Sequence, residues 1–197
     1  MRYTLLSVTP EANGDVLLSV RTLTEDGEGK KRRVIAAAED YREVGSPAPG
    51  AILFPEDAAI LFRKSDRTAA IERAYTILSS SDNSAAALQR KLTERGFLPT
   101  IAAEAAEYMQ GKGYLNEPEA CRRYVVQWAE KRHFGPRRIL AELVRKGYPR
   151  STAKEAITAL EEDGDLDFAL VKEKLLATLP EGTPEEKIRA LLYKNGF

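Results

Sequence analysis

Two arginines at the expected start of a helix are the most unusual local pattern in this sequence. In the run Gly135-Pro136-Arg137-Arg138-Ile139, the proline suits the first helical position, so both arginines fall in the first turn. Positive charge there opposes the helix macrodipole and costs roughly a few tenths of a kcal/mol per residue. Arginines beside unpaired backbone NH groups can also bind an anion, either a phosphate or a carboxylate of a protein partner. Two solvated arginines on an exposed face are the alternative interpretation.

A second helix start, near the C-terminus, follows the usual rule. The run Thr183-Pro184-Glu185-Glu186 places acidic residues in the first turn, and Glu186 occupies the capping-box position after Thr183. Because the same rule is broken at one helix start and obeyed at the other, we predict that the two arginines serve a function.

The two arginines lie within a basic zone of a chain that is neutral as a whole. The sequence has 30 basic and 30 acidic residues, which argues against a general nucleic-acid binder. From Arg122 to Arg150, however, nine residues are basic and only Glu130 and Glu142 are acidic, so a partner could recognise this zone. The predicted contact residues, for a protein partner or for DNA, are Arg122, Arg123, Arg132, Arg137, Arg138, Arg145 and Lys146.

Aromatic residues in the same zone are predicted to be structural. Tyr124 and Trp128 fall on the apolar stripe of an expected helix, together with Cys121 and Val125. Core packing is therefore the preferred interpretation, and base stacking is the alternative.

The residue types that common enzymes need are almost absent. No Gly-rich phosphate loop is found, so nucleotide hydrolysis is not expected. Cys121 and His133 are the only residues of their types, which excludes an internal disulfide and the usual zinc site and leaves almost no nucleophile and base pair. The acidic residues 161–167 resemble the start of a calcium loop, but Phe168 and Lys174 occupy the positions that need Gly and Glu, so we predict a solvated linker. We expect no enzyme activity, no cofactor and no metal site.

We expect a monomer that acts in the cytoplasm. No stretch approaches the roughly 20 apolar residues of a membrane span. The N-terminus lacks the longer apolar run and the small-residue cleavage site of a signal peptide.

Residues 1–66 show the signals of a small antiparallel sheet. Strands are predicted at residues 3–8, 16–23 and 33–36, with turns at residues 13–15 and 26–29. Two prolines and two glycines predict a loop at residues 45–50. The next stretch is ambiguous, because residues 51–54 could form a strand, whereas Pro55-Glu56-Asp57 would suit the start of a short helix that ends near Lys64.

From Thr68 onward the apolar period changes to that of a helix. One helical face is formed by Ile71, Ala74, Tyr75 and Leu78. Ser84 is a predicted N-cap of a second helix that ends at Gly96. A third helix is expected to start near Pro99 and to end around Gly111.

This three-helix plan recurs along the chain. One motif occurs three times. It consists of an apolar residue, a second apolar residue four positions later and, after four more positions, a glycine that is followed by an aromatic residue. The copies end at Gly96-Phe97, Gly147-Tyr148 and Gly196-Phe197, which lie 51 and 49 residues apart. We therefore predict a mainly α fold of tandem three-helix repeats, two complete and one truncated, in an elongated curved array behind a small antiparallel β-containing segment. The expected segments are residues 1–66 (β-rich), 67–115 (repeat 1), 116–162 (repeat 2) and 163–197 (truncated repeat 3).

Three phrases in this order resemble the RecX family of bacterial regulatory proteins, which control the RecA recombinase. They are Leu88-Gln89-Arg90-Lys91-Leu92 leading to Gly96-Phe97, then Gly113-Tyr114-Leu115-Asn116-Glu117, and then Gly135-Pro136-Arg137-Arg138-Ile139 with Glu142-Leu143 and Lys146-Gly147. The chain departs from the family pattern at Ala87, where an acid is usual, and at Ala120, where a Phe is usual.

The resemblance implies a protein that lies along the groove of the RecA filament on single-stranded DNA. Such a protein slows RecA ATP hydrolysis and strand exchange in homologous recombination, DNA repair and the SOS response. The best contact residues under this hypothesis are Arg137, Arg138, Arg145 and Lys146. The alternative is a helical-repeat module that binds nucleic acid directly and independently of RecA, and its signature would be a steep loss of DNA affinity with salt.

Overall fold

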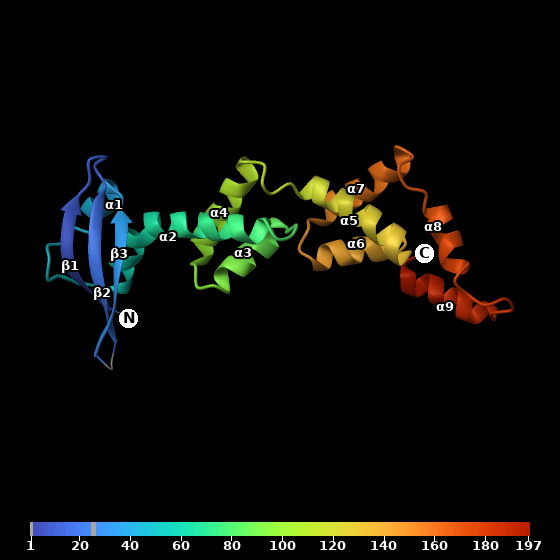
Figure 1. The fold of residues 1–197 in the computed structure, drawn as a ribbon, viewed down its shortest axis with the longest axis horizontal. Coiled ribbons are helices and arrows are strands. Elements are labelled where there is room, and N and C mark those ends of the chain that lie inside the picture. The colour runs from blue at the N-terminus through green and yellow to red at the C-terminus, as the bar shows by residue number, and fades with distance from the viewer. Residues whose placement is uncertain (1, 25–26) are drawn as a thin grey trace. The chain divides into compact units, whose positions relative to one another are not determined.

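The first part of the chain forms a four-stranded antiparallel sheet (Figure 1). The computed structural model describes residues 2–24 and 27–197. Within them, the strands are β1 (Arg2–Pro10), β2 (Val16–Thr24), β3 (Gly27–Ala36) and β4 (Ile52–Leu53). Their order across the sheet is β3-β2-β1-β4, with every neighbouring pair antiparallel.

Two helices cover one face of this sheet. They are α1 (Ala38–Glu43) and α2 (Pro55–Leu78). Side chains alternate between the two faces of a strand, so Leu18 and Val34 point toward the helices and pack in one core with Leu61 and Phe62 of α2. Residues between them in sequence, such as Arg33, point to the opposite face.

The sequence predictions for this part need three corrections. β3 begins at Gly27, so residues 27–29 belong to a strand and not to the predicted turn, and position 26 lies outside the described residues. The sequence pattern did not predict α1. The helix that starts at Pro55 does not end near Lys64 but runs for 24 residues to Leu78, because no glycine or proline interrupts it. Residues 51–57 contain both predicted alternatives, since β4 directly precedes α2.

The rest of the described chain is helical. The helices are α3 (Ala85–Thr93), α4 (Pro99–Gly111), α5 (Glu117–Arg132), α6 (Pro136–Arg145), α7 (Arg150–Glu162), α8 (Phe168–Leu176) and α9 (Glu185–Asn195). The protein is therefore mainly α-helical behind an N-terminal antiparallel sheet, as predicted.

Several predicted helix ends are confirmed by their capping geometry. The Ser84 side chain accepts a hydrogen bond from the Ala87 backbone NH at 3.1 Å, which makes it the N-cap of α3. Gly96 and Gly147 follow α3 and α6 with φ angles of 91° and 92°, the left-handed conformation that favours glycine. The predicted linker at residues 161–167 contains Asp167, whose side chain caps α8 by accepting from the Ala169 NH at 2.7 Å.

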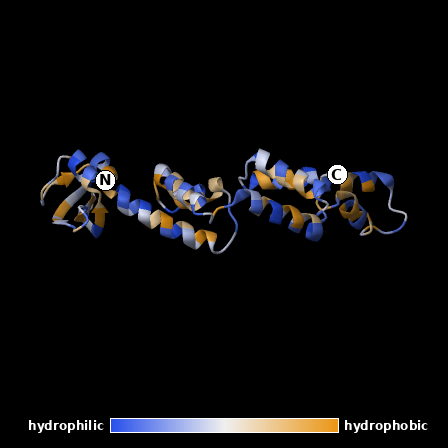
Figure 2. Cartoon of the chain, turned by 90° about the horizontal axis from the view of Figure 1, so that it is seen from above, coloured by the Kyte–Doolittle hydropathy of each residue, from blue (hydrophilic) through white to orange (hydrophobic). Residues whose placement is uncertain are grey.

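The chain divides into two compact units. The first comprises Met1–Arg73 and Gly96–Ala105, and the second comprises Ala74–Arg95 and Ala106–Phe197. The core of the second unit lies between α5, α6, α7 and α8, where Val125, Ile139 and Leu143 are fully buried. Figure 2 shows hydrophobic and hydrophilic residues mixed along the helices. Among the described residues, no helix has the length and apolar character that crossing a membrane requires.

Candidate partner-binding groove

Helices α5 and α6 enclose a groove in the second unit, which we call the basic groove. It has a volume of about 430 Å³. Its lining residues are Tyr124, Gln127, Trp128, Lys131, Arg132, Phe134, Glu142, Arg145 and Lys146. The two helices can pack side by side because the chain reverses at His133, which adopts a left-handed conformation with φ of 52° at the end of α5.

Positive charge dominates the basic groove. Lys131 and Arg132 come from the last turn of α5, and Arg145 and Lys146 come from the end of α6. Glu142 is the only acidic side chain among the described lining residues, and the Nε atom of Arg145 donates to it at 3.0 Å. Because one acid faces four bases, the groove keeps an excess of positive charge that suits an acidic surface or a phosphate.

The aromatic residues of the basic groove are part of the core, as predicted. Trp128 is only 7% exposed, and its ring centroid lies 5.0 Å from that of Tyr124. The ammonium of Lys146 sits over the Tyr124 ring at 4.7 Å. Since burial and a cation cover these rings, they offer little free surface for stacking a base.

The first turn of α6 contacts the C-terminal end of α9. The Gly135 NH donates to the carbonyl of Asn195 at 2.6 Å, and the Arg137 NH donates to the carbonyl of Gly196 at 3.3 Å. The Arg138 guanidinium donates to the carbonyl of Lys194 at 2.9 Å, and that of Arg137 donates to the carbonyl of Phe197.

This contact gives a structural reason for the two arginines at the helix start. The last carbonyls of a helix carry the negative end of its macrodipole. Arg137 and Arg138 have the unfavourable sign for α6 but the favourable sign for the end of α9. Two backbone NH groups at the start of α6, which could have bound an external anion, donate their hydrogen bonds to carbonyls at the end of α9 instead.

Glycines allow the two helix ends to approach closely. A Cβ atom at Gly196 would lie 2.3 Å from the Arg138 nitrogen, and one at Gly135 would lie 2.6 Å from the Gly196 carbonyl oxygen. Both distances are shorter than any tolerable contact, so neither position has room for a larger residue.

The same kind of contact joins α6 to α3. The carbonyl of Lys146, at the end of α6, accepts a hydrogen bond at 3.0 Å from the hydroxyl of Ser84, the N-cap of α3. A Cβ atom at Gly147 would lie 2.8 Å from that hydroxyl. In both cases, the end of a later helix meets the start of an earlier one at a glycine.

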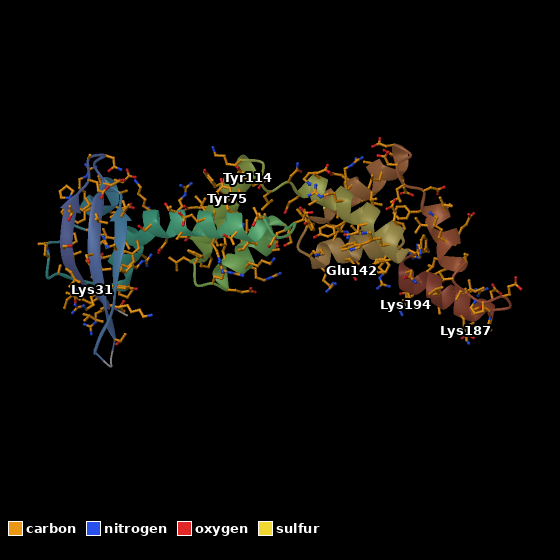
Figure 3. All side chains as sticks on the ribbon, in the orientation of Figure 1. Lys31, Tyr75, Tyr114, Glu142, Lys187 and Lys194 are labelled. Atoms are coloured by element: carbon orange, nitrogen blue, oxygen red, sulfur yellow. The ribbon has the colours of Figure 1, made fainter. Side chains whose placement is uncertain are left out.

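A second hollow, of about 550 Å³, lies where α6 meets α9. Its lining residues are Arg137, Arg138, Glu142, Tyr193, Lys194 and Gly196. Glu142 also lines the basic groove, so the two hollows adjoin on α6; Figure 3 labels Glu142 and Lys194 on their helices. Tyr193 is 80% exposed at this site.

The remaining two predicted contact residues lie in ion pairs away from the basic groove. Arg122 contacts the carboxylates of Asp163 and Asp165 at 3.4 and 3.3 Å. Arg123 contacts Asp82 at 2.7 Å, and this hydrogen bond raises the pKa of the arginine. These pairs connect α5 to the loops before α3 and after α7.

The structure therefore separates the seven predicted residues into three groups. Arg132, Arg145 and Lys146 meet in the basic groove, Arg137 and Arg138 hold α9, and Arg122 and Arg123 form ion pairs. Sequence reasoning did not select Lys131, Glu142, Tyr193 or Lys194, which also line the two hollows. Lys131 belongs to the same basic zone, so its charge was a usable signal. Tyr193 and Lys194 are brought to α6 only by the fold.

The single cysteine has no catalytic environment. Cys121 is fully buried, and burial followed by the nearby charge of Glu117 raises the pKa of its thiol to about 11. A thiol with such a pKa is protonated at neutral pH and is a poor nucleophile.

Three curated proteins with similar sequences are regulatory proteins named RecX. The RecX protein of Trichlorobacter lovleyi is 29% identical over 130 residues, which cover 63% of this chain and 84% of that protein. The one from Cronobacter sakazakii is 26% identical over 147 residues, which cover 68% of this chain and 88% of that protein. For Mycolicibacterium smegmatis the identity is 26% over 110 residues, and the match spans 56% of that protein. The chain matches no protein-family model.

Two solved structures with a similar fold carry the same name. A crystal structure of regulatory protein RecX aligns with a TM-score of 0.63 and 18% identity, and the alignment covers 98% of this chain and 94% of the other. The structure of RecX from Lactobacillus salivarius aligns with a TM-score of 0.57 and 19% identity over 68% of this chain and 90% of the other. At such identities, the structures establish the shared fold.

Proposed function

The chain belongs to the RecX family of regulatory proteins, and from this premise we propose that it binds the filament that RecA forms on single-stranded DNA. On the filament it modulates, and mostly inhibits, RecA ATP hydrolysis and strand exchange. Family membership makes the chain a regulatory protein and not an enzyme. The proposed function takes place in the cytoplasm, where it contributes to recombination and DNA repair.

The charge of the basic groove is the observation that carries the proposal. Lys131, Arg132, Arg145 and Lys146 converge there from two helices, while the chain as a whole is neutral. Local positive potential of this kind steers association with an acidic surface and selects the orientation of the partner.

We assign different tasks to the arginines of α5 and α6. The side chains of the basic groove contact the filament. Arg137 and Arg138 hold α9 beside the groove, so that Tyr193 and Lys194 extend the contact surface. Arg122 and Arg123 join α5 to the loops that follow α7 and precede α3, through their carboxylate partners.

We further infer that the helices form three-helix repeats, and that repeat 2 (residues 116–162) carries most of the contact with the filament. The support is the recurring contact at a glycine, in which the end of α6 meets the start of α3 and the end of α9 meets the start of α6. Repeated units that stack through the same contact present equivalent surfaces to equivalent subunits of a filament.

The test is RecA ATP hydrolysis on single-stranded DNA in the presence of the double variant Arg132→Glu and Lys146→Glu. Both side chains are exposed, so the charge reversal leaves the core intact. We expect half-maximal inhibition to require at least about tenfold more protein, because two attractive charges become repulsive.

The matched control is Lys154→Glu with Lys172→Glu, two exposed lysines of α7 and α8 that lie outside both hollows. It changes the net charge by the same amount and should inhibit like the unmodified chain. Equal inhibition by all three proteins would show that the basic groove is not the contact site.

A pull-down with RecA separates this function from the alternative of a nucleic-acid module that acts independently of RecA. Our proposal expects capture by RecA filaments on single-stranded DNA and little capture by bare DNA. Capture by bare DNA alone would favour the alternative. The covered rings of Tyr124 and Trp128 give that alternative little support from the groove.

A further inference from the structure

The second unit carries a group of three tyrosines that belongs neither to the basic groove nor to the contact between α6 and α9. We call Tyr75, Tyr108 and Tyr114 the tyrosine cluster. Tyr75 lies in the last turn of α2, Tyr108 lies near the end of α4, and Tyr114 follows α4 (Figure 3). The ring centroids of Tyr75 and Tyr114 are 4.9 Å apart, with the ring planes at 77°. Partial burial, followed by the neighbouring phenols of Tyr108 and Tyr114, raises the pKa of Tyr75, so the three rings form one group.

Two rings of the tyrosine cluster are exposed to solvent. Tyr114 is 58% exposed and Tyr75 is 36% exposed. The apolar pattern predicted Tyr75 on the inner face of its helix beside Ala74, but Ala74 is fully buried and Tyr75 is not. Exposed aromatic rings that lie together are typical of interaction surfaces.

The turn that holds Tyr114 does not itself need an aromatic residue. The same turn recurs 51 residues later, where Gly164 has the φ of 75° that Gly113 has before Tyr114. Asp165 occupies the position equivalent to Tyr114, and it is exposed and forms an ion pair with Arg122. Because this turn accepts a charged residue at that position, the exposed ring of Tyr114 indicates a function other than forming the turn.

A third hollow, of about 260 Å³, adjoins the tyrosine cluster at Tyr114. The charged side chains among its described lining residues are Asp82, Glu119 and Arg123. The Arg123 guanidinium contacts Asp82 at 2.7 Å and Glu119 at 3.4 Å. Two carboxylates therefore share one cation, and the third hollow has an excess of negative charge. The basic groove has an excess of the opposite sign.

The chemistry of this site fits a basic side chain of a protein partner. The face of an aromatic ring attracts an ammonium or a guanidinium group. Lys112 shows this attraction within the chain, since its ammonium lies 5.6 Å from the centre of the Tyr108 ring. Carboxylates in the third hollow attract the same kind of cation and repel a phosphate backbone. Tyrosine is also among the residues that contribute most to the energy of contacts between proteins.

One helix holds the two oppositely charged sites in a fixed relation. Glu119 and Arg123 lie in the first half of α5, and Lys131 and Arg132 lie at its end. With a rise of about 1.5 Å per residue, Glu119 and Lys131 are about 18 Å apart along the helix axis. A partner with an acidic and a basic patch at this separation binds in one orientation, because the reverse orientation would place like charges together.

We propose that the tyrosine cluster and the third hollow bind an arginine or lysine side chain of the RecA surface, and that this contact and the basic groove together orient the protein on the filament. The inference rests on the function proposed above and adds to it a second contact of opposite charge. Tyr75 and Tyr114 supply ring surface, and Glu119 supplies negative charge.

The test measures the affinity of the full-length protein for RecA filaments on single-stranded DNA. For the double variant Tyr75→Ala with Tyr114→Ala we expect at least about a tenfold loss, because aromatic anchors carry a large share of binding energy. Tyr75→Phe with Tyr114→Phe keeps both rings and should bind within about threefold of the unmodified chain.

Leu170→Ala is the matched control for the loss of exposed apolar surface. Leu170 lies on α8, is 46% exposed and is outside all three hollows. This variant should bind filaments like the unmodified chain.

Glu119→Gln tests the charge of the partner side chain. Glu119 is exposed, and its loss leaves Arg123 bonded to Asp82. We expect at least about a threefold loss of filament affinity, because an attractive charge is removed. Unchanged affinity would overturn the assignment of a basic partner side chain.

Thermal unfolding distinguishes binding from a structural role. Because both rings are exposed, the double alanine variant should melt close to the unmodified chain. If it melts much earlier, the single variant Tyr114→Ala replaces it, and the loss of affinity must still appear.

Three further outcomes would overturn the inference, and they can be told apart. If the unmodified chain fails to bind filaments, the proposed function falls and this inference falls with it. If the unmodified chain binds and the double alanine variant binds equally well, only this inference falls. If the double alanine variant loses affinity for bare oligothymidylate by the same factor as for filaments, the rings stack nucleobases and do not bind a protein side chain.

Discussion

Single glycines decide whether the end of α9 can reach α6. Gly196 has a φ of 87°, and its Cα faces the backbone of Arg138. Gly135 supplies the other side of the same contact. Glycine is therefore required at position 196 for steric as well as conformational reasons. The two contributions can be measured separately, because Gly182 also has a positive φ but has no neighbouring atoms that an added Cβ would meet.

We predict that Gly196→Ala destabilises the protein more than Gly182→Ala does. Both glycines have positive φ, 87° and 76°, so both variants lose about 1 kcal/mol to backbone strain. Only at position 196 does the added Cβ also collide with the Arg138 nitrogen, which should bring the total to about 2–3 kcal/mol. Urea unfolding of the two variants gives both numbers. Equal losses would show that α9 moves freely enough to accommodate the methyl group.

At the scale of elements, the positive charges at the start of α6 interact with the carbonyl groups at the end of α9. A helix start normally attracts acids, as Glu185 and Glu186 show at α9. The start of α6 carries arginines because the carbonyl end of another helix lies against it. The arginines of α6 therefore stabilise α9, and α9 in turn positions Tyr193 and Lys194 beside the basic groove.

We predict that Arg137→Gln with Arg138→Gln loosens α9 and leaves the helices of the core in place. The guanidinium contacts to the carbonyls of Lys194 and Phe197 are lost, while Ile139 keeps α6 in the core. Amide hydrogen exchange in α9 should accelerate at least about tenfold, with exchange in α5 and α7 unchanged.

Arg189→Gln is the control for this pair of substitutions. Arg189 contacts Glu185 within α9 and is largely exposed, so its loss should change exchange little. Protection of α9 that survives the removal of both α6 arginines would contradict the role that we give them.

At the scale of the whole molecule, the chain has separate cores for its sheet and for the helices α5 to α8. The sheet core contains Leu5, Leu18 and Leu61, the helical core contains Val125 and Leu143, and the two sets share no residue. The basic groove lies over the helical core.

We predict that core damage in one unit stays local. Leu18→Ala and Leu143→Ala each remove a fully buried side chain, a change that costs about 2–5 kcal/mol. Leu18→Ala should accelerate hydrogen exchange in β1 to β3 and spare α5 to α7, and Leu143→Ala should do the reverse. If each variant accelerated exchange equally in both regions, the chain would unfold as a single cooperative unit.

The sequence by itself determined those features that depend on neighbours along the chain. The apolar period predicted the helices from α3 onward, and capping chemistry placed the Ser84 N-cap and the left-handed glycines after α3 and α6. The three phrases identified the family because their order is a property of sequence alone. Local patterns failed at α2, because the sequence predicted a short helix that ends near Lys64 and a helical period that begins at Thr68. In the fold one helix runs through this stretch, where Ser65 and Asp66 bond to β3.

Only the tertiary structure decided what the basic residues do. Arg132 and Arg137 look equivalent in sequence, yet one lines an open groove and the other is bonded to α9. The difference depends on residues that lie far along the chain, whose approach is set by packing and by the absence of a Cβ at Gly196. The arginines at the start of α6 were rightly selected as unusual, and their partner could be found only once the helix ends were placed together.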